Sequence, residues 1–245
     1  MILEELGANM CAETDDGITA LHLAALGGHT EAVQALVELL ADVDTQDHGG
    51  RTALSFAAGN GHLETVKALQ ELGAIVHTRD SEERTPLIRA ARKGQAQMVK
   101  VLAELGADVH ARDEEGRTGF HWAACNGHVQ ALKTLAELGA DVHARGNWGS
   151  TALHEAAVSG HTETVKALAK LGADVCVQDN DGDTALHKAA LRGHTETVKA
   201  LVELGVGVLV QDNDGRTALH LAAAWGRTET VEALEELETN VQPLV

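Results

Sequence analysis

One spacing organises the whole chain of 245 residues, because similar motifs recur every 33 residues. Threonine occupies one position of this register in all seven copies. Glycine lies two residues before it in six copies, and Glu83 takes that position in the other. The glycines are Gly17, Gly50, Gly116, Gly149, Gly182 and Gly215. A repeat of this length is one small unit that buries its apolar face only by stacking on neighbouring units.

The motifs inside each copy predict two helices. Threonine is a favoured residue just before a helix, and here it precedes a Leu-His-x-Ala-Ala motif such as Leu186–Ala190. A Gly-His pair such as Gly193 and His194 then interrupts the helix. A second helix follows, for example from Thr195 to Leu204, and a glycine ends it, as Gly106 does in the third copy. Each copy is therefore predicted to be turn, helix, short loop, helix.

The full pattern is D-x-x-G-x-T-A-L-H-x-A-A-x-x-G-H-T-E-x-V-x-A-L-x-x-L-G-A-D-V, and it closely resembles the ankyrin repeat over nearly the entire chain. The resemblance implies an all-α fold, an ankyrin-repeat solenoid of stacked helix-turn-helix units with β-turn or hairpin connections. We expect a single domain over residues 1–245, in which residues 1–13 form a partial repeat. The full repeats are expected at 14–46, 47–79, 80–112, 113–145, 146–178, 179–211 and 212–244.

The composition agrees with close stacking of helices. Aromatic residues make up only 2% of the chain and tyrosine is absent, so the apolar 44% comes mainly from alanine, leucine and valine. Pairs of alanines recur in the first predicted helix, as at Ala123 and Ala124. Because small side chains let helix axes approach closely, we expect a continuous core that needs few aromatic residues.

The charge narrows the classes of partner. A net charge of −18 argues against nucleic acid and against a membrane surface. The odd and widely spaced Cys11, Cys125 and Cys176 provide no disulfide framework, and the first residues lack the basic segment of a signal peptide. We therefore expect an intracellular protein, in the cytoplasm or the nucleus, that is a monomer or associates end to end.

Fourteen histidines suggest a metal site as an alternative. Ten belong to the repeat motifs, where the resemblance implies that they hydrogen-bond locally. His77, His110 and His143 form a further 33-residue series, but adjacent repeats lie roughly 8–10 Å apart, too far for a shared ion bound at about 2 Å. Cys125 has His121 four residues before it, which leaves a nucleophilic cysteine as a second alternative. We expect no enzyme, no metal and no cofactor.

One position of the repeat differs most between copies. It lies two residues before the second alanine of the Ala-Ala motif, on the first predicted helix of each copy. The residues there are Leu23, Phe56, Arg89, Trp122, Glu155, Lys188 and Leu221. In the ankyrin family the turn tips and this inner helix form the binding surface, so the resemblance implies that this column contacts a partner.

Charge and residue type place the expected contact region in the third to fifth repeats. Residues 80–112 carry a net charge of +1, and arginine and tryptophan are the residues enriched at interface hot spots. The predicted partner-binding residues are Arg79, Arg84, Arg89, Arg92, Lys93, Arg112, Arg117, Trp122, Asn126, Trp148 and Glu155. Alternatively, the arginines only balance acidic residues of the turns, which are Glu82, Glu83, Glu114 and Glu115.

The sequence thus predicts a protein-binding adaptor, scaffold or targeting module without catalytic residues. Two alternatives remain open. The repeats could carry a metal, ligand or enzymatic site at the His77, His110 and His143 column or at Cys125, or the chain could be an engineered repeat scaffold.

Overall fold

The computed structural model describes residues 12–39 and 41–241, which contain fourteen helices and no strand. The all-helical repeat fold predicted from the sequence is confirmed. The partial repeat predicted at residues 1–13 falls almost wholly outside the described residues. Two compact units are present, one up to Glu114 and one from Glu115.

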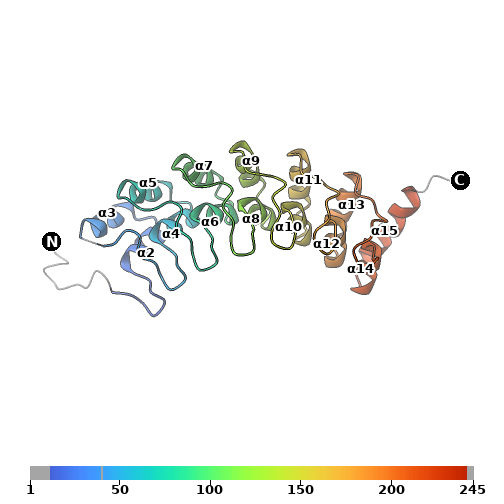
Figure 1. Ribbon diagram of the computed structural model, residues 1–245, viewed down its shortest axis with the longest axis horizontal. Coiled ribbons are helices and arrows are strands. Elements are labelled where there is room, and N and C mark those ends of the chain that lie inside the picture. The colour runs from blue at the N-terminus through green and yellow to red at the C-terminus, as the bar shows by residue number, and fades with distance from the viewer. Residues whose placement is uncertain (1–11, 40, 242–245) are drawn as a thin grey trace. The chain divides into compact units, whose positions relative to one another are not determined.

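The first unit consists of three helix pairs. We call the first helix of each pair the inner helix and the second the outer helix. The inner helices are α2 (Ala20–Leu26), α4 (Ala53–Asn60) and α6 (Pro86–Arg92), and the outer helices are α3 (Thr30–Glu38), α5 (Leu63–Glu71) and α7 (Ala96–Glu104). Each inner helix packs on the next inner helix and on its own outer helix, so the unit has two rows (Figure 1).

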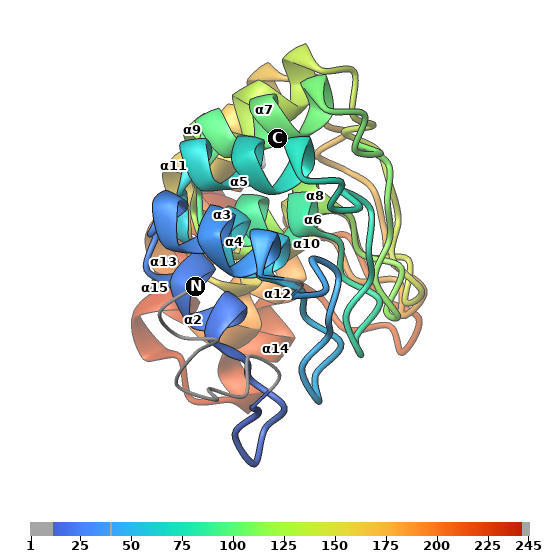
Figure 2. The same ribbon diagram turned by 90° about the vertical axis from the view of Figure 1, so that its left-hand side faces the viewer.

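The second unit repeats this arrangement with four pairs. Its inner helices are α8 (Gly119–Cys125), α10 (Ala152–Val158), α12 (Ala185–Arg192) and α14 (Ala218–Ala224). Its outer helices are α9 (Val129–Glu137), α11 (Thr162–Lys170), α13 (Thr195–Glu203) and α15 (Thr228–Val241). In each unit the loops between successive pairs extend to one side, away from the helices (Figure 2).

The core is built from small aliphatic side chains, as the composition predicts. The alanine pair is buried in the first six inner helices, for example Ala123 and Ala124 on α8, whereas Ala223 of α14 is exposed. The leucine two residues after the capping threonine is also buried, except for the partly exposed Leu219. Phe120 takes the leucine position on α8 and is only 1% exposed. Because alanine faces the neighbouring helix, successive helices approach closely, and Phe56 and Phe120 are the two phenylalanines buried with them.

Threonine begins each inner helix, and a histidine completes the cap in most repeats. In the sixth repeat the N–H of Thr184 donates to His187 Nδ1 over 3.2 Å, and the Thr184 hydroxyl lies 2.9 Å from the same nitrogen. This histidine replaces the glutamate of an ordinary capping box. Ser55 and Ile88 occupy its position in the second and third repeats, where the threonine hydroxyl accepts the backbone N–H directly.

The same histidines join one repeat to the next. Nε2 of His154 lies 3.0 Å from the carbonyl oxygen of Asp183, and Nε2 of His187 lies 3.1 Å from that of Arg216. A carbonyl only accepts a hydrogen bond, so Nε2 carries a proton. Nδ1 accepts the N–H of the capping threonine and therefore carries none, which makes the ring neutral. Burial lowers the pKa of His154 below its ordinary value, which favours the same neutral form.

A second column of histidines follows the inner helices. His161 Nε2 bonds to the carbonyl of Cys125 over 3.1 Å, and His194 Nε2 bonds to that of Val158 over 3.0 Å. Each therefore ties a loop to the carboxyl end of the preceding inner helix. The local hydrogen-bonding role that the family resemblance implied for these histidines is confirmed.

The turn tips are linked by backbone hydrogen bonds. In the first unit the N–H of Ser81 donates to Gly49 O over 2.9 Å, and in the second the N–H of Asn180 donates to Trp148 O over 3.1 Å. The glycine two residues before each capping threonine has positive φ, and Glu83 adopts the same conformation with φ of 61°. A side chain in this left-handed region costs about 1–2 kcal/mol.

We expect Glu83→Gly to stabilise the chain relative to Glu83→Gln. Both variants lose the exposed ion pair between Arg79 and Glu83, but only glycine removes the backbone strain. Glycine also adds entropy to the unfolded chain, which offsets part of the relieved strain. The glycine variant should therefore be more stable than the glutamine variant by roughly 0.5–1 kcal/mol of unfolding free energy. Urea unfolding of the two variants measures it. A glycine variant no more stable than the glutamine variant would contradict this account of the turn.

We also expect His154 to make stability depend on pH. Its pKa is lowered in the folded protein, so the unfolded chain binds the proton at a higher pH than the folded chain does. The stabilisation is therefore complete above the ordinary pKa of about 6.5 and is lost as pH falls below it.

The control variant is His154→Ser, since Ser55 already occupies this position in the second repeat. Between pH 7 and pH 5 the wild type should lose stability more steeply than the variant, by at most about 1.4 kcal/mol per pH unit. Parallel losses in the two proteins would show that His154 does not titrate in this way.

Candidate functional site

The variable column lies on the fourth residue of every inner helix, surrounded by a framework that is nearly the same in each repeat. In the first unit it consists of Leu23, Phe56 and Arg89, and in the second of Trp122, Glu155, Lys188 and Leu221. Their exposure ranges from 52% for Leu23 to 6% for Leu221. In five of the seven repeats the column side chain contacts a residue of the adjacent turn.

In the first unit Asp80 organises the turn beside Arg89. Its Oδ1 accepts the N–H groups of Glu82 and Arg84 over 3.0 and 2.9 Å. Its Oδ2 accepts Nε of Arg84 over 3.0 Å and a terminal nitrogen of Arg89 over 3.1 Å. One carboxylate is therefore shared by two guanidinium groups, and Arg84 forms a further ion pair with Glu82.

The two arginines are both largely withdrawn from solvent. Arg84 is buried against Asp80, and the Arg89 side chain is 19% exposed. Burial lowers the pKa of Arg89, whereas the charge of Asp80 raises it. The Arg89 guanidinium stays charged at neutral pH, because the ordinary pKa of arginine lies far above neutral pH. Nε of Arg89 is buried and has no hydrogen-bond partner within the described part of the chain.

A small hollow lies beside Arg89 at the ends of α4 and α6. It has a volume of about 50 Å³ and is lined by Gly59, Asn60, Arg89, Arg92 and Lys93. The Asn60 side chain is held in place because its amide donates to the carbonyl of Phe56 over 2.8 Å. Three of the predicted site residues thus meet at one place in the first unit.

Arg79 and Arg112 lie at the turn tips of the first unit. A terminal nitrogen of Arg79 donates to the carbonyl of Arg112 over 2.7 Å and to that of Glu83 over 3.1 Å. Arg79 also pairs with the Glu83 carboxylate. These bonds join successive turn tips, so Arg79 has a structural role whether or not it contacts a partner.

In the second unit Arg117 and Trp122 form one stacked pair. The guanidinium carbon of Arg117 lies 4.0 Å from the centre of the Trp122 ring, and Arg117 also pairs with Glu115 over 3.0 Å. Asn126 donates its side-chain amide to the carbonyl of Trp122 over 2.8 Å. The stack leaves Trp122 half-buried and presents a flat, cationic surface on α8.

Glu155 and Trp148 have different environments in the next repeat. Glu155 is half-buried on α10, where burial raises its pKa and a hydrogen bond from the Ser150 hydroxyl, 3.3 Å away, opposes that rise. Trp148 lies at the turn tip and is 72% exposed. A large apolar side chain so exposed at the tip of a turn is a feature typical of interaction sites.

Two column members outside the predicted set are also held by their turns. The guanidinium of Arg51 lies 4.7 Å from the centre of the Phe56 ring. Lys188 Nζ lies 2.7 Å from Oδ2 of Asp179 and 2.7 Å from Oδ2 of Asp183. Phe56 and Lys188 both belong to the variable column that the sequence shows. They are not among the predicted binding residues because charge and residue type favoured the third to fifth repeats.

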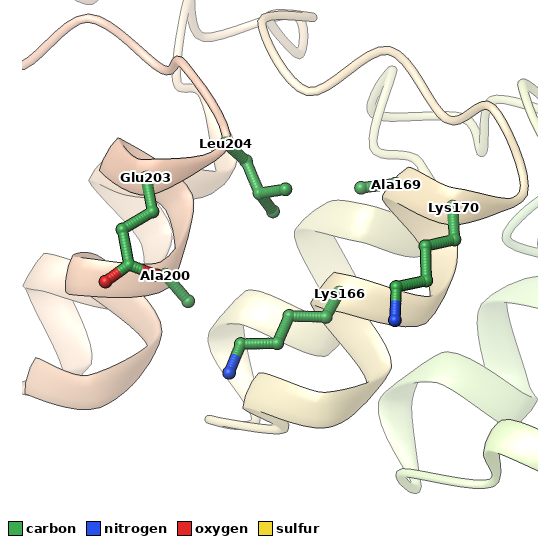
Figure 3. A pocket seen from close by; sticks show the side chains of 6 residues that line it. All are labelled: Lys166, Ala169, Lys170, Ala200, Glu203 and Leu204. Atoms are coloured by element: carbon green, nitrogen blue, oxygen red, sulfur yellow. The ribbon is translucent and has the colours of Figure 1, made fainter.

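A separate cavity of about 420 Å³ lies between two outer helices of the second unit. Lys166, Ala169 and Lys170 line it from α11, and Ala200, Glu203 and Leu204 line it from the end of α13 (Figure 3). None of the sequence motifs predicts this cavity. The sequence feature that distinguishes this place is Lys170. The other outer helices with described side chains have glutamate at this position, as at Glu137 and Glu203.

The catalytic alternative finds no support around Cys125. Both ring nitrogens of His121 are hydrogen-bonded, Nδ1 with Thr118 and Nε2 with the carbonyl of Ser150. Cys125 Sγ lies 3.7 Å from the Ser159 hydroxyl oxygen. His121 is thus bound into the repeat framework and is not positioned as a base for the thiol.

The metal alternative is not supported either. Across residues 12–39 and 41–241, no group of three or more His, Cys, Asp or Glu side chains is arranged to hold a metal ion. Cys11, which extends the His77, His110 and His143 series, is outside the described residues.

Among the described helices, none combines the length and apolar character needed to cross a bilayer.

The comparisons with known proteins agree with the geometry. The sequence matches the family model described as ankyrin repeats (3 copies) over residues 1–80, 37–113, 87–179 and 171–243. No curated protein matches. The crystal structure of the human ASB11 ankyrin repeat domain matches with a TM-score of 0.82 and 29% identity, covering 93% of this chain and 100% of that chain.

Ankyrin repeats are generally non-enzymatic modules of protein–protein interaction. The fold is shared by many solved proteins, so the repeat framework alone does not identify a partner. The matched residues extend over almost the full sequence, and the chain belongs to the ankyrin repeat family.

Proposed function

We propose that this chain is a non-catalytic adaptor, scaffold or targeting module that binds a protein partner through its inner helices and turn tips. The observation that carries the proposal is the variable column. The cap, the buried alanines and the histidine hydrogen bonds recur from repeat to repeat, whereas the column residue changes from leucine to aromatic to charged.

A binding surface on a repeat framework needs this combination. The recurring residues fix the backbone, and the column and turn residues supply chemical differences along it. The proposed contact residues in the first unit are Arg79, Arg84, Arg89, Arg92, Lys93 and Arg112. In the second unit they are Arg117, Trp122, Asn126, Trp148 and Glu155.

The pairing of several arginines with turn carboxylates does not remove them from this surface. Arg117 pairs with Glu115 and still covers the face of Trp122, which gives the pair both charge and flat apolar area. Arg89 is bonded to Asp80 and still lines a hollow. Residues already held in one rotamer lose little conformational entropy when a partner binds.

We propose further that residues 1–245 act as one ankyrin domain, without cofactor, as an intracellular monomer in the cytoplasm. The negative charge of −18 supports a protein partner over nucleic acid or a membrane surface. Association end to end is the competing arrangement, and light scattering of the purified chain separates a monomer from such assemblies.

The proposal is tested by partner capture with matched variants. The wild-type chain is immobilised, the proteins it retains from its native source are identified by mass spectrometry, and the affinity of each is measured. Arg89→Ala and Trp122→Ala should each weaken binding of the true partner by at least about tenfold, because hot-spot truncations cost about 2 kcal/mol or more.

Lys133→Ala on the outer helix α9 is the matched control, since Lys133 is an exposed cation away from the inner helices. It should leave the affinity unchanged. Circular dichroism establishes that each variant is folded. Unchanged affinity of both inner-helix variants for the partner would overturn the proposal. A loss of affinity caused by Lys133→Ala alone would also overturn it.

A further inference from the structure

Two repeats place a cation at the variable column, and the number of carboxylates bound to that cation differs. In the second unit Lys188 is bound by two carboxylates, those of Asp179 and Asp183, both at 2.7 Å. In the first unit Arg89 pairs with Asp80, which it shares with Arg84, and Glu82 pairs with Arg84. The reason lies in the sequence, because Arg84 stands at the repeat position that Asp183 occupies.

Arg89 therefore has more hydrogen-bond donors than the residues around it provide acceptors. A guanidinium offers five N–H donors, and within the described residues the hydrogen bond of Arg89 goes to Asp80. Its buried Nε has no partner. A buried donor without an acceptor costs free energy, so an added acceptor beside this group would be bound favourably.

The hollow beside Arg89 provides room for such an acceptor. Gly59 contributes no side chain, and a Cβ built on it would come no nearer than 4.0 Å to Nε of Arg89. Asn60 borders the hollow from α4, and Arg92 and Lys93 border it from the end of α6. A volume of about 50 Å³ accommodates a group the size of a carboxylate and excludes a large ring.

The surrounding charge favours a negative group at this place. The charged residues at and next to the hollow are four cations and two carboxylates, namely Arg84, Arg89, Arg92 and Lys93 with Asp80 and Glu82. This local excess of cations lies on a chain whose net charge is −18. An acidic segment is therefore repelled by most of the chain and attracted here, which adds specificity to the affinity.

We propose that the hollow formed by Asn60, Arg89, Arg92 and Lys93 binds a side-chain carboxylate from an acidic segment of the protein partner. The proposal rests on the function proposed above. The carboxylate accepts hydrogen bonds from the Arg89 guanidinium, and Lys93 contributes charge at the open edge. Partners with a run of glutamate or aspartate would be selected over neutral ones.

Binding of hexaglutamate to the full chain tests the proposal, with hexaglutamine as the neutral probe. Backbone amide resonances of Asn60 and Gly94 report occupancy in a nitrogen–proton NMR titration. Hexaglutamate should shift both signals saturably, and hexaglutamine should not. Arg89→Met and Lys93→Ala should each weaken hexaglutamate binding at least fivefold.

The matched control is Arg192→Ala, because Arg192 is the cation at the position of Lys93 in the sixth repeat. It should leave the affinity within twofold of the wild type. Thermal unfolding verifies that Arg89→Met is folded, which is expected because Asp80 keeps its bonds to Arg84. An affinity that Arg89→Met leaves unchanged, or that Arg192→Ala lowers equally, would overturn the proposal. A site that binds a phosphoserine peptide but not hexaglutamate would do so as well.

The experiments distinguish a failure of the carboxylate site from a failure of the proposed function. If hexaglutamate does not bind but Trp122→Ala weakens capture of the partner, the carboxylate site is wrong and the inner-helix surface stands. If hexaglutamate binds as expected but neither Arg89→Ala nor Trp122→Ala affects the partner, the hollow is an anion site and the proposed function is wrong.

Discussion

The hydrogen bond from each buried histidine to the following repeat is the interaction on which the rest of the structure depends. The imidazole of His154 caps its own helix through Thr151 and reaches the carbonyl of Asp183 in the next turn. His121 and His187 do the same within the second unit, and His22 does so in the first. A single ring therefore fixes a helix start, a turn and the spacing between two repeats.

That bond also explains where the variable side chains lie. The carbonyl groups that accept it belong to Arg51, Ser150, Asp183 and Arg216, which precede the capping threonines. The side chains of the first three then contact the column, since Arg51 lies over Phe56, Ser150 bonds to Glu155 and Asp183 binds Lys188. In these turns the histidine holds the backbone, so the turn side chain meets its column residue in a fixed position. The same framework can thus present an aromatic ring in one repeat and a charge in another.

Much of the fold could be predicted from the sequence because it is local and repeated. The capping threonines, the helix-ending glycines such as Gly106 and the alanine pairs each follow from short motifs, and the structure contains them, with the alanine pair buried in six of the seven repeats. The site could be predicted only as a column of residues. Whether Arg84 is exposed or buried depends on its distance to Asp80 in three dimensions, and residue type alone does not give it. The outer-helix cavity at Lys170 depends on how the ends of α11 and α13 pack, which no motif specifies.

The central claim is that one face of the repeats, formed by inner helices and turn tips, contacts the partner. Hydroxyl-radical footprinting of the unmodified chain, free and with its captured partner, tests this most directly, because it reads side-chain exposure without any substitution. Oxidation of Trp122 on α8 and of Trp148 at its turn tip should fall when the partner binds, and oxidation of Leu204 after the outer helix α13 should stay the same. Protection of Leu204 with both tryptophans still oxidised at their free rates would contradict the account.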